Sequence, residues 1–367
     1  MAPTDDPLAR RYRRLLRCYP RAYRRERGDE LLALLLDTAP PGQSRPRLRE
    51  AVDLIRNGMR CRLGRPASST VVAWAALAAV VCGLFSAALS ARVAWETARP
   101  LPGPAETGEI FRTVLPDHGP DHVDIPSSFF GYYTQPLGLD DLDNLLLGDG
   151  GEYQQTATDA WAAGPPPVPS DQTVAVAQRR LRETGWHLDG VTVESANGCV
   201  DKLCASSMLI TYTTVNARQG DTLLAVTVNS NPEPESPYAS IALRRTTPPL
   251  VLPAAVGGGL LGALAGWLLF GWASRRTEAP HPARTVVKVL LGVTLLLWWL
   301  PVLVSVPALA SHHRGEPHAQ WHPLWEWLGQ PTLSLFFLVG SVSALLGIAL
   351  ATLPRRDADR VSTLASG

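Results

Sequence analysis

Charged residues are missing from four long windows of this sequence, although Asp, Glu, Lys and Arg make up 18 % of its 367 residues. A helix needs about 20 apolar residues to cross the ~30 Å hydrocarbon core of a bilayer. Each window is long enough, and four of them argue against a soluble globular protein. We therefore predict membrane-spanning helices over residues 71–91, 251–273, 286–308 and 332–353.

The sequence also lacks the common signatures of catalysis. Lysine occurs only at Lys202 and Lys288, and neither follows the GxxxxG run of a phosphate-binding loop, while GxSxG and HExxH do not occur. The pattern GxGxxG starts at Gly257 inside an apolar window, not after a strand, so it indicates no dinucleotide site. No window carries an ionised residue near its middle, as ion-moving transporters usually do, although Pro301 and Pro307 should break the third span and expose carbonyls. We expect neither an enzyme nor a bound cofactor.

Acidic and basic residues are unevenly distributed along the chain. Residues 1–66 contain sixteen arginines and eight acidic residues, whereas residues 92–248 contain twenty acidic residues and ten basic ones. The loop after the second window and the tail 354–367 are basic too. Positive residues beside spans mark the cytoplasmic side, and the first apolar run begins too late to be a secretory signal. We therefore expect a multi-pass protein of the cell membrane, with both termini cytoplasmic and residues 92–248 and 309–331 outside.

The cysteines are consistent with this orientation. Cys199 and Cys204, in the run GCVDKLC, lie in the segment expected outside, where an oxidising compartment permits a disulfide. Cys18, Cys61 and Cys82 lie in cytoplasmic or membrane segments, where thiols stay reduced. A redox or metal pair fits Cys199 and Cys204 less well, because four residues separate them.

Residues 1–66 have the periodicity of three short amphipathic helices. The first extends to Tyr19, Pro20 opens the second, which runs to about Asp37, and Ser44 is a candidate cap for the third. In the third helix, apolar residues recur at spacings of three or four, at Leu48, Val52, Ile55, Met59 and Leu63. Three helices this short do not easily bury so much apolar surface among themselves, so we predict that a cytoplasmic protein binds them.

This segment also resembles a known module. The string LLRCYPRAYRRERGDELLALLLD, followed after a Pro/Gly loop by RLREAVDLIRNGMRCRLG, is similar to the N-terminal prefix of many actinobacterial multispanning membrane proteins, called the HAAS signalling domain or permease prefix domain. The matching positions are Tyr19, Pro20, Tyr23, Gly28, Glu30 and Leu31. The resemblance covers the first ~65 residues. It implies coupling to a PadR-type transcriptional regulator or to a transporter subunit, and no catalytic residue.

The arginine excess of this segment has two interpretations. Arginines can set the topology and lie against anionic lipid headgroups of the bilayer, or they can bind nucleic acid. Here they alternate with acidic residues, and no DNA-reading motif accompanies them. We favour the lipid bilayer and expect no nucleic-acid partner.

The segment expected outside divides in two. Residues 92–170 are rich in Pro, Gly and Asp and end in the stiff linker AAGPPPVPS. Residues 171–247 begin with a helical pattern that places Val174, Ala177 and Leu181 on one face. Four strand-like runs follow, GVTVES, MLITYTTV, TLLAVTVN and YASIALRR. We predict one helix on a four-stranded antiparallel sheet, and hence four transmembrane helices with a cytoplasmic three-helix segment and an α+β extracytoplasmic domain.

Two histidine groups are candidate metal ligands. The loop 309–331 contains His312, His313, His318 and His322, and the run DHGPDHVD contains His118 and His122. Imidazole and carboxylate groups suit zinc, but these spacings match no standard zinc site. We therefore do not predict a metal centre at either place.

Three glycines of the second window recur every fourth residue, at Gly258, Gly262 and Gly266. Such a ridge lets another helix approach closely. Packing within one bundle is the favoured interpretation, and self-association into a homo-oligomer is the alternative.

Three classes of function are compatible with these features. The domain layout and the prefix favour a membrane-anchored sensor or regulatory protein that couples an extracytoplasmic module to cytoplasmic helices. An accessory or structural subunit of a membrane transport complex is the second class, supported by the glycine ridge. An enzyme or transporter in its own right comes third, since the required residue constellations are absent.

Overall fold

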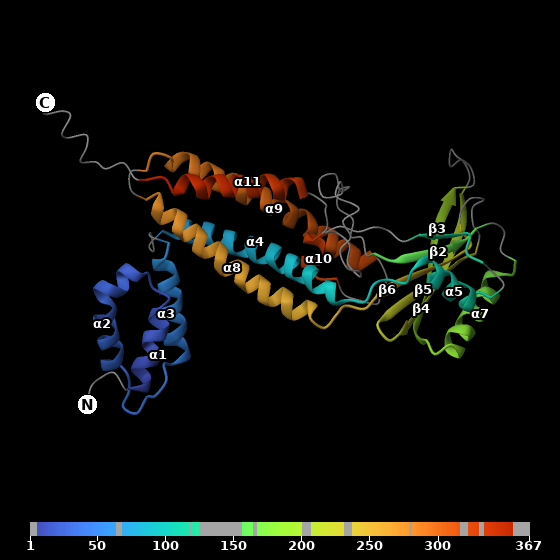
Figure 1. Cartoon of the computed structure of the whole chain (residues 1–367), viewed down its shortest axis with the longest axis horizontal. Helices are drawn as coiled ribbons and strands as arrows, with labels where there is room; N and C mark the ends of the chain where they lie inside the picture. Colours follow the sequence, from blue (N-terminus) through green and yellow to red (C-terminus); the bar gives the residue numbers. More distant parts are fainter. Residues whose placement is uncertain are drawn as a thin grey trace. The chain divides into compact units, whose positions relative to one another are not determined.

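The computed structural model describes residues 6–63, 68–116, 119–124, 156–163, 167–199, 207–230, 237–278, 281–315, 322–329 and 334–354. Helices form the two ends of the described chain, and the strands lie in its middle part, as Figure 1 shows. The chain divides into two compact units. One contains Met1–Ser86, Gly259–Leu300 and Phe336–Gly367, and the other contains Ala87–Gly258 and Pro301–Leu335.

The first unit begins with three short helices, α1 (Pro7–Leu16), α2 (Arg21–Asp37) and α3 (Leu48–Cys61). These agree with the three helices that the sequence predicts. Ser44 does not cap α3, however. The cap residue is Arg47, whose backbone N–H donates to the Glu50 side chain, while the carbonyl of Ser44 accepts a hydrogen bond from Arg11.

Three described helices are long and apolar enough to cross a membrane: α4 (Ser69–Ala94), α8 (Val251–Arg276) and α9 (Arg284–Gly315). A fourth apolar helix, α11 (Ser334–Ala351), is shorter. These helices indicate a membrane location. Pro301 and Pro307 lie inside α9 and do not break it, contrary to expectation. The helix also continues through His312 and His313, which were expected in a loop.

Within the first unit, the apolar helices pack through small residues and polar side chains. A Cβ added at Gly266 of α8 would lie 2.9 Å from the Cys82 Cβ of α4, so the two backbones are close. Between α9 and α11, the Thr294 hydroxyl donates to the Gly340 carbonyl (3.1 Å) and Trp298 Nε1 donates to the Phe337 carbonyl (3.2 Å). Residues later in α9 thus meet earlier residues of α11, and the two helices run antiparallel.

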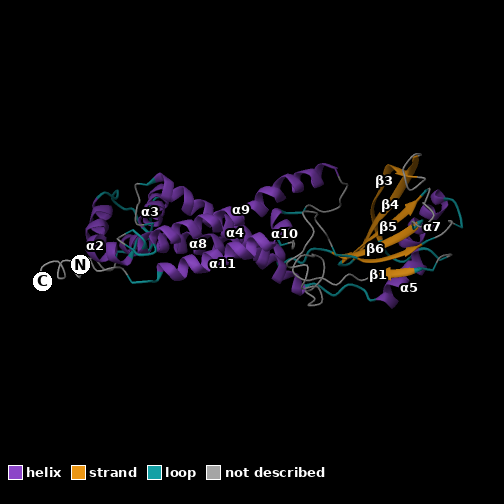
Figure 2. Cartoon of the chain, turned by 90° about the horizontal axis from the view of Figure 1, so that it is seen from above, coloured by secondary structure: helices purple, strands orange, loops and turns teal. Residues whose placement is uncertain are grey.

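The second unit contains a six-stranded antiparallel sheet in the order β1-β2-β6-β5-β4-β3. Its strands are β1 (His122–Asp124), β2 (Thr158–Ala162), β3 (His187–Cys199), β4 (Ser207–Gln219), β5 (Thr222–Asn229) and β6 (Ala239–Arg245). Two helices, α5 (Pro104–Val114) and α7 (Ser170–Glu183), lie beside the strands in Figure 2. The turn between β4 and β5 uses Gly220 at a φ of 60°, which a glycine adopts readily.

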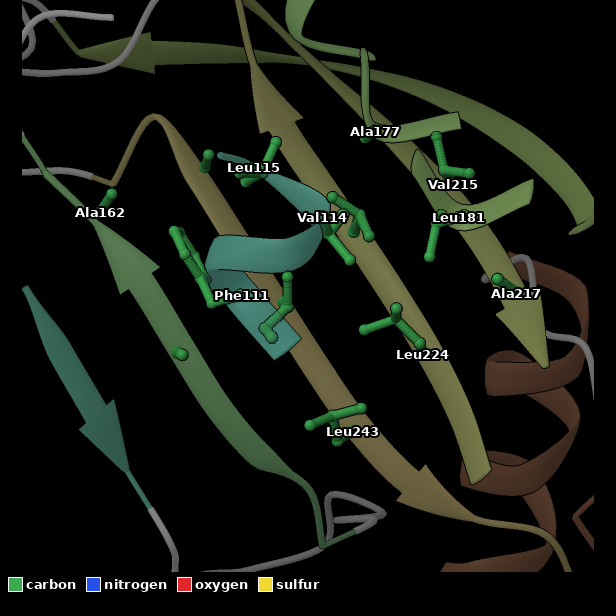
Figure 3. Packing of buried hydrophobic residues seen from close by; sticks show 14 of the residues in the cluster. Phe111, Val114, Leu115, Ala162, Ala177, Leu181, Val215, Ala217, Leu224 and Leu243 are labelled. Carbon is green, nitrogen blue, oxygen red and sulfur yellow. The ribbon is translucent and has the colours of Figure 1, made fainter. Parts of the chain in front are cut away.

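The core of this domain lies between the sheet and its two helices. Along β5 and β6 every second residue is buried, as expected for strands with one covered face. Figure 3 shows Phe111 and Val114 of α5 and Leu181 of α7 packed over Leu224 of β5 and Leu243 of β6. Burial of this apolar surface holds both helices on the same face of the sheet.

The sequence predicts β3 to β6 and α7 but misses the rest of the domain. Residues 92–170 were expected to lie outside the folded module, yet they provide α5, β1 and β2. The strands β1 and β2 have only three and five residues, too few for a periodicity to be recognised. Two further short helices belong to this unit, the 3₁₀ helix η1 (Trp95–Thr97) and α10 (Leu324–Leu328).

Candidate functional site

The two faces of α3 have different environments. Leu54 and Gly58 are buried, and Leu54 joins a core made with α1 and α2. On the other face, Leu48, Val52 and Ile55 are 82 %, 53 % and 41 % exposed. We call these three side chains the apolar stripe. These residues belong to the apolar pattern for which the sequence predicts a protein interface.

Close packing around Gly58 fixes the orientation of α3. A Cβ at Gly58 would lie 2.9 Å from the Cβ of Cys18 and 3.0 Å from Cδ2 of Tyr19. The Arg62 side chain, just after α3, donates to the carbonyls of Cys18 (2.6 Å) and Arg17 (2.9 Å). These contacts satisfy carbonyls at the end of α1 and hold the buried face of α3 inward, so that the stripe faces outward.

A hydrogen-bonded pair links α1 to the beginning of α3. The Tyr12 hydroxyl donates to Glu50 Oε2 (2.9 Å), and the same oxygen accepts from the backbone N–H of Arg47 (3.1 Å). Burial and the neighbouring Glu50 carboxylate raise the pKa of Tyr12 to about 12. The hydrogen bond from Tyr12 in turn lowers the pKa of Glu50. Each group therefore favours the protonation state that it has at neutral pH.

The end of α3 contacts the apolar helix α8. Trp267 Nε1 donates to the Met59 carbonyl (3.2 Å), and a Cβ at Gly271 would lie 2.9 Å from the Arg62 carbonyl. Leu63 is completely buried there, and Met59 is half-buried. Of the five residues in the predicted pattern, the last two are therefore covered within the chain, and the first three form the apolar stripe.

Three of the four candidate histidines in 309–331 come together, and His318 lies outside the described residues. His313 Nε2 donates to the His322 carbonyl (2.9 Å), and His322 Nδ1 donates to Glu326 Oε2 (3.1 Å). The ring of His312 lies 5.7 Å from that of His322. His322 and Glu326 are both buried, and their pair joins α10 to the segment before it. Among the described residues, no group of three or more ligands is placed to hold a metal.

The other candidate residues are placed as follows. His122 lies on β1, with its ring 4.6 Å from that of Trp161 on β2, and His118 lies outside the described residues. Cys199 ends β3, but its side chain and all of Cys204 are likewise outside them. The disulfide stays a prediction, which thiol labelling of intact cells without reductant tests.

The three ridge glycines lie on α8. A Cβ at Gly262 would clash with the Ser86 side chain and lie 2.6 Å from the Cys82 carbonyl, both on α4. Gly266 faces Cys82 and Ala78 of the same helix. The environment of these two glycines is thus the α4 helix of the same chain, and Gly258 is half-buried.

A buried arginine joins both chain connections of the sheet domain. Arg245, the last residue of β6, donates to the Pro100 carbonyl (2.5 Å), to the Thr222 hydroxyl and to Asp221 (3.4 Å). Arg99 binds the same Asp221 carboxylate at 2.6 Å. Arg99 and Pro100 follow α4 and η1, whereas Arg245 precedes α8. We call this set the Arg245 junction. The sequence gives no signal for it, because its members are up to 146 residues apart.

Comparison with known proteins adds no relative: no family model, no curated protein and no solved structure matches the chain.

Proposed function

We propose that this chain is a membrane-anchored sensor or regulatory protein whose N-terminal helices bind a cytoplasmic protein. The observation that carries this proposal is the apolar stripe, which α3 presents while its opposite face packs on α1 and α2. A patch of large apolar side chains on a small, otherwise arginine-rich segment is typical of an interface. A topology signal alone requires only a few arginines beside a span and no such stripe.

The proposal includes four spans, with α11 as the fourth. Its charge-free sequence and its antiparallel packing on α9 support this assignment. At the other end of α11, Arg276 donates to the carbonyls of Ala351 and Thr352 (both 3.3 Å). The C-terminal ends of α8 and α11 thus lie side by side, as expected for two spans of the same direction.

The Arg245 junction supports mechanical coupling between the sheet domain and the apolar helices α4 and α8. It joins the chain that leaves α4 to the chain that enters α8, and both to the β4–β5 turn. Beyond it, Trp95, Val251 and Ala255 belong to one small core, so the nearby ends of α4 and α8 are packed together. A shift of the sheet would therefore act on these ends of both helices.

The resemblance of the prefix to the HAAS module suggests the chemical class of the partner. A PadR-type transcriptional regulator corresponds to the sensor, and a transporter subunit corresponds to the second function, an accessory subunit of a membrane complex. The identity of the captured protein therefore distinguishes the two functions.

Photo-cross-linking in cells tests the proposal. A photoreactive amino acid at Val52 of the full-length chain should capture one protein, whereas the same group at Glu26, an exposed position on α2, should capture much less. Leu48→Glu should abolish the product by placing a charge on the stripe, and Asp53→Asn, on exposed α3 surface, should not. Capture of lipid alone at Val52, unaffected by Leu48→Glu, would contradict a protein partner and leave a membrane-bound prefix.

A further inference from the structure

A cavity of about 460 Å³ opens among α4, α8 and α9 within the first unit. This volume lies within the range of ~300–1,000 Å³ that is usual for small-molecule sites. All three helices are apolar and long enough to cross a membrane, and lipids would surround them there. An added Cβ at Gly292, which lines it, would meet no atom within 4 Å.

The polar and apolar residues of the cavity lie at different levels. Ser68 and Thr70 are at the beginning of α4, Ser274 and Thr277 are near the end of α8, and Lys288 is in the second turn of α9. Deeper along the same helices, the lining is apolar, with Trp74, Phe270, Leu291 and Leu295. One end of the cavity is therefore hydroxyl-rich and cationic, and the other is suited to a hydrocarbon chain.

Among the described residues that line the cavity, Lys288 carries the only charge and none is a carboxylate. A lysine at the end of a span keeps its ammonium group at headgroup level while its methylene stem lies along apolar surface. A basic site between helices at this level attracts the phosphate of an anionic lipid. The charge, the gradient of polarity and the volume of the cavity are all suited to the same kind of ligand.

We propose that this cavity binds one anionic phospholipid, with its phosphate at Lys288 and one acyl chain between Phe270, Leu291 and Trp74. The lipid would connect three helices that converge where the N-terminal segment joins α4. The site depends on the membrane location of these helices and not on the protein partner proposed above.

Lipid retention by the purified full-length protein tests this site. The protein is exchanged in detergent with phosphatidylglycerol or phosphatidylcholine, and bound lipid is counted by native mass spectrometry. Wild type should retain one phosphatidylglycerol in preference to phosphatidylcholine. Lys288→Gln should weaken phosphatidylglycerol binding about fivefold, the equivalent of one lysine at a membrane surface. Arg314→Gln, which removes an exposed cation at the opposite end of α9, should leave phosphatidylglycerol binding unchanged.

A second pair of variants tests the apolar part of the cavity. Gly292→Leu should fill it and reduce retention of both lipids. Gly257→Leu is the matched control, because Gly257 also has open space around its Cα but lines none of the described pockets. Equal phosphatidylglycerol binding by wild type and Lys288→Gln would overturn the headgroup assignment. Unchanged binding by Gly292→Leu, in protein that remains monodisperse, would overturn the cavity as the site.

Discussion

Gly58 lies where α3 meets the turn between α1 and α2, and a Cβ there would be 2.9 Å from the Cβ of Cys18 and 3.0 Å from the ring of Tyr19, closer than van der Waals contact. We expect Gly58→Val to destabilise the N-terminal helices by about 1–3 kcal/mol, since the Cβ and the carbonyl carbon of Cys18 cannot withdraw without moving backbone. Hydrogen exchange of α1–α3 in the full-length protein measures this. Gly28→Ala, where the nearest atom is 3.7 Å away, should be neutral or stabilising because alanine favours the helix.

The Tyr12–Glu50 hydrogen bond predicts a pH dependence. The pKa of Tyr12 is raised from 10.0 to about 12 in the folded protein, so the folded state holds this proton more tightly than the unfolded state does. The resulting stabilisation is complete below pH 10, and it is lost as the pH rises from 10 through 12.

The tyrosinate absorbance of wild type minus that of Tyr12→Phe should therefore have its midpoint near pH 12. Glu50→Gln should move this midpoint down, because it removes the carboxylate that accepts the hydrogen bond and repels the phenolate. A midpoint near pH 10 in the otherwise wild-type protein would show that Tyr12 is not buried against Glu50.

At the scale of elements, the contact between α4 and α8 depends on small residues. Gly262→Leu should separate the two helices, because its side chain would occupy the space of Ser86 and the Cys82 carbonyl. We expect a loss of about 1–3 kcal/mol, seen as a lower melting temperature in detergent. Gly257→Leu should leave the melting temperature unchanged, and an equal effect of both variants would place the contact elsewhere on α8.

The elements that the sequence predicts are those whose pattern is complete within one segment. The strands β5 and β6 each alternate buried and half-buried residues over seven positions, and α7 places Ala177 and Leu181 on its buried face as expected. In α5, Phe111 and Val114 are a turn apart, a signal that the surrounding Pro and Gly residues obscured. A short helix or strand is stabilised by contacts distant in sequence, so its own pattern is weak.

For the whole molecule, the charge distribution predicts a single orientation. Reporter fusions after residues 66, 240, 280, 320 and 360 should read inside, outside, inside, outside and inside, because basic residues outnumber acidic ones in each segment expected in the cytoplasm and in no segment expected outside. The reporters at 320 and 360 test α11 in particular, since it is the shortest of the four apolar helices. The same side for both would show that α11 does not cross the membrane, and a cytoplasmic reporter at 240 would reverse the orientation of the outer domain.

The sequence by itself determined the apolar helices, the three N-terminal helices and the four longer strands, since each follows from a periodicity or a charge-free run of neighbouring residues. Only the tertiary structure decided which residues of these elements are left exposed. It covers Met59 and Leu63 while leaving Val52 uncovered, and it joins Arg245 to Pro100. The physical reason is that burial and hydrogen bonding depend on groups far apart along the chain, whereas helix and strand periodicity depends on near neighbours.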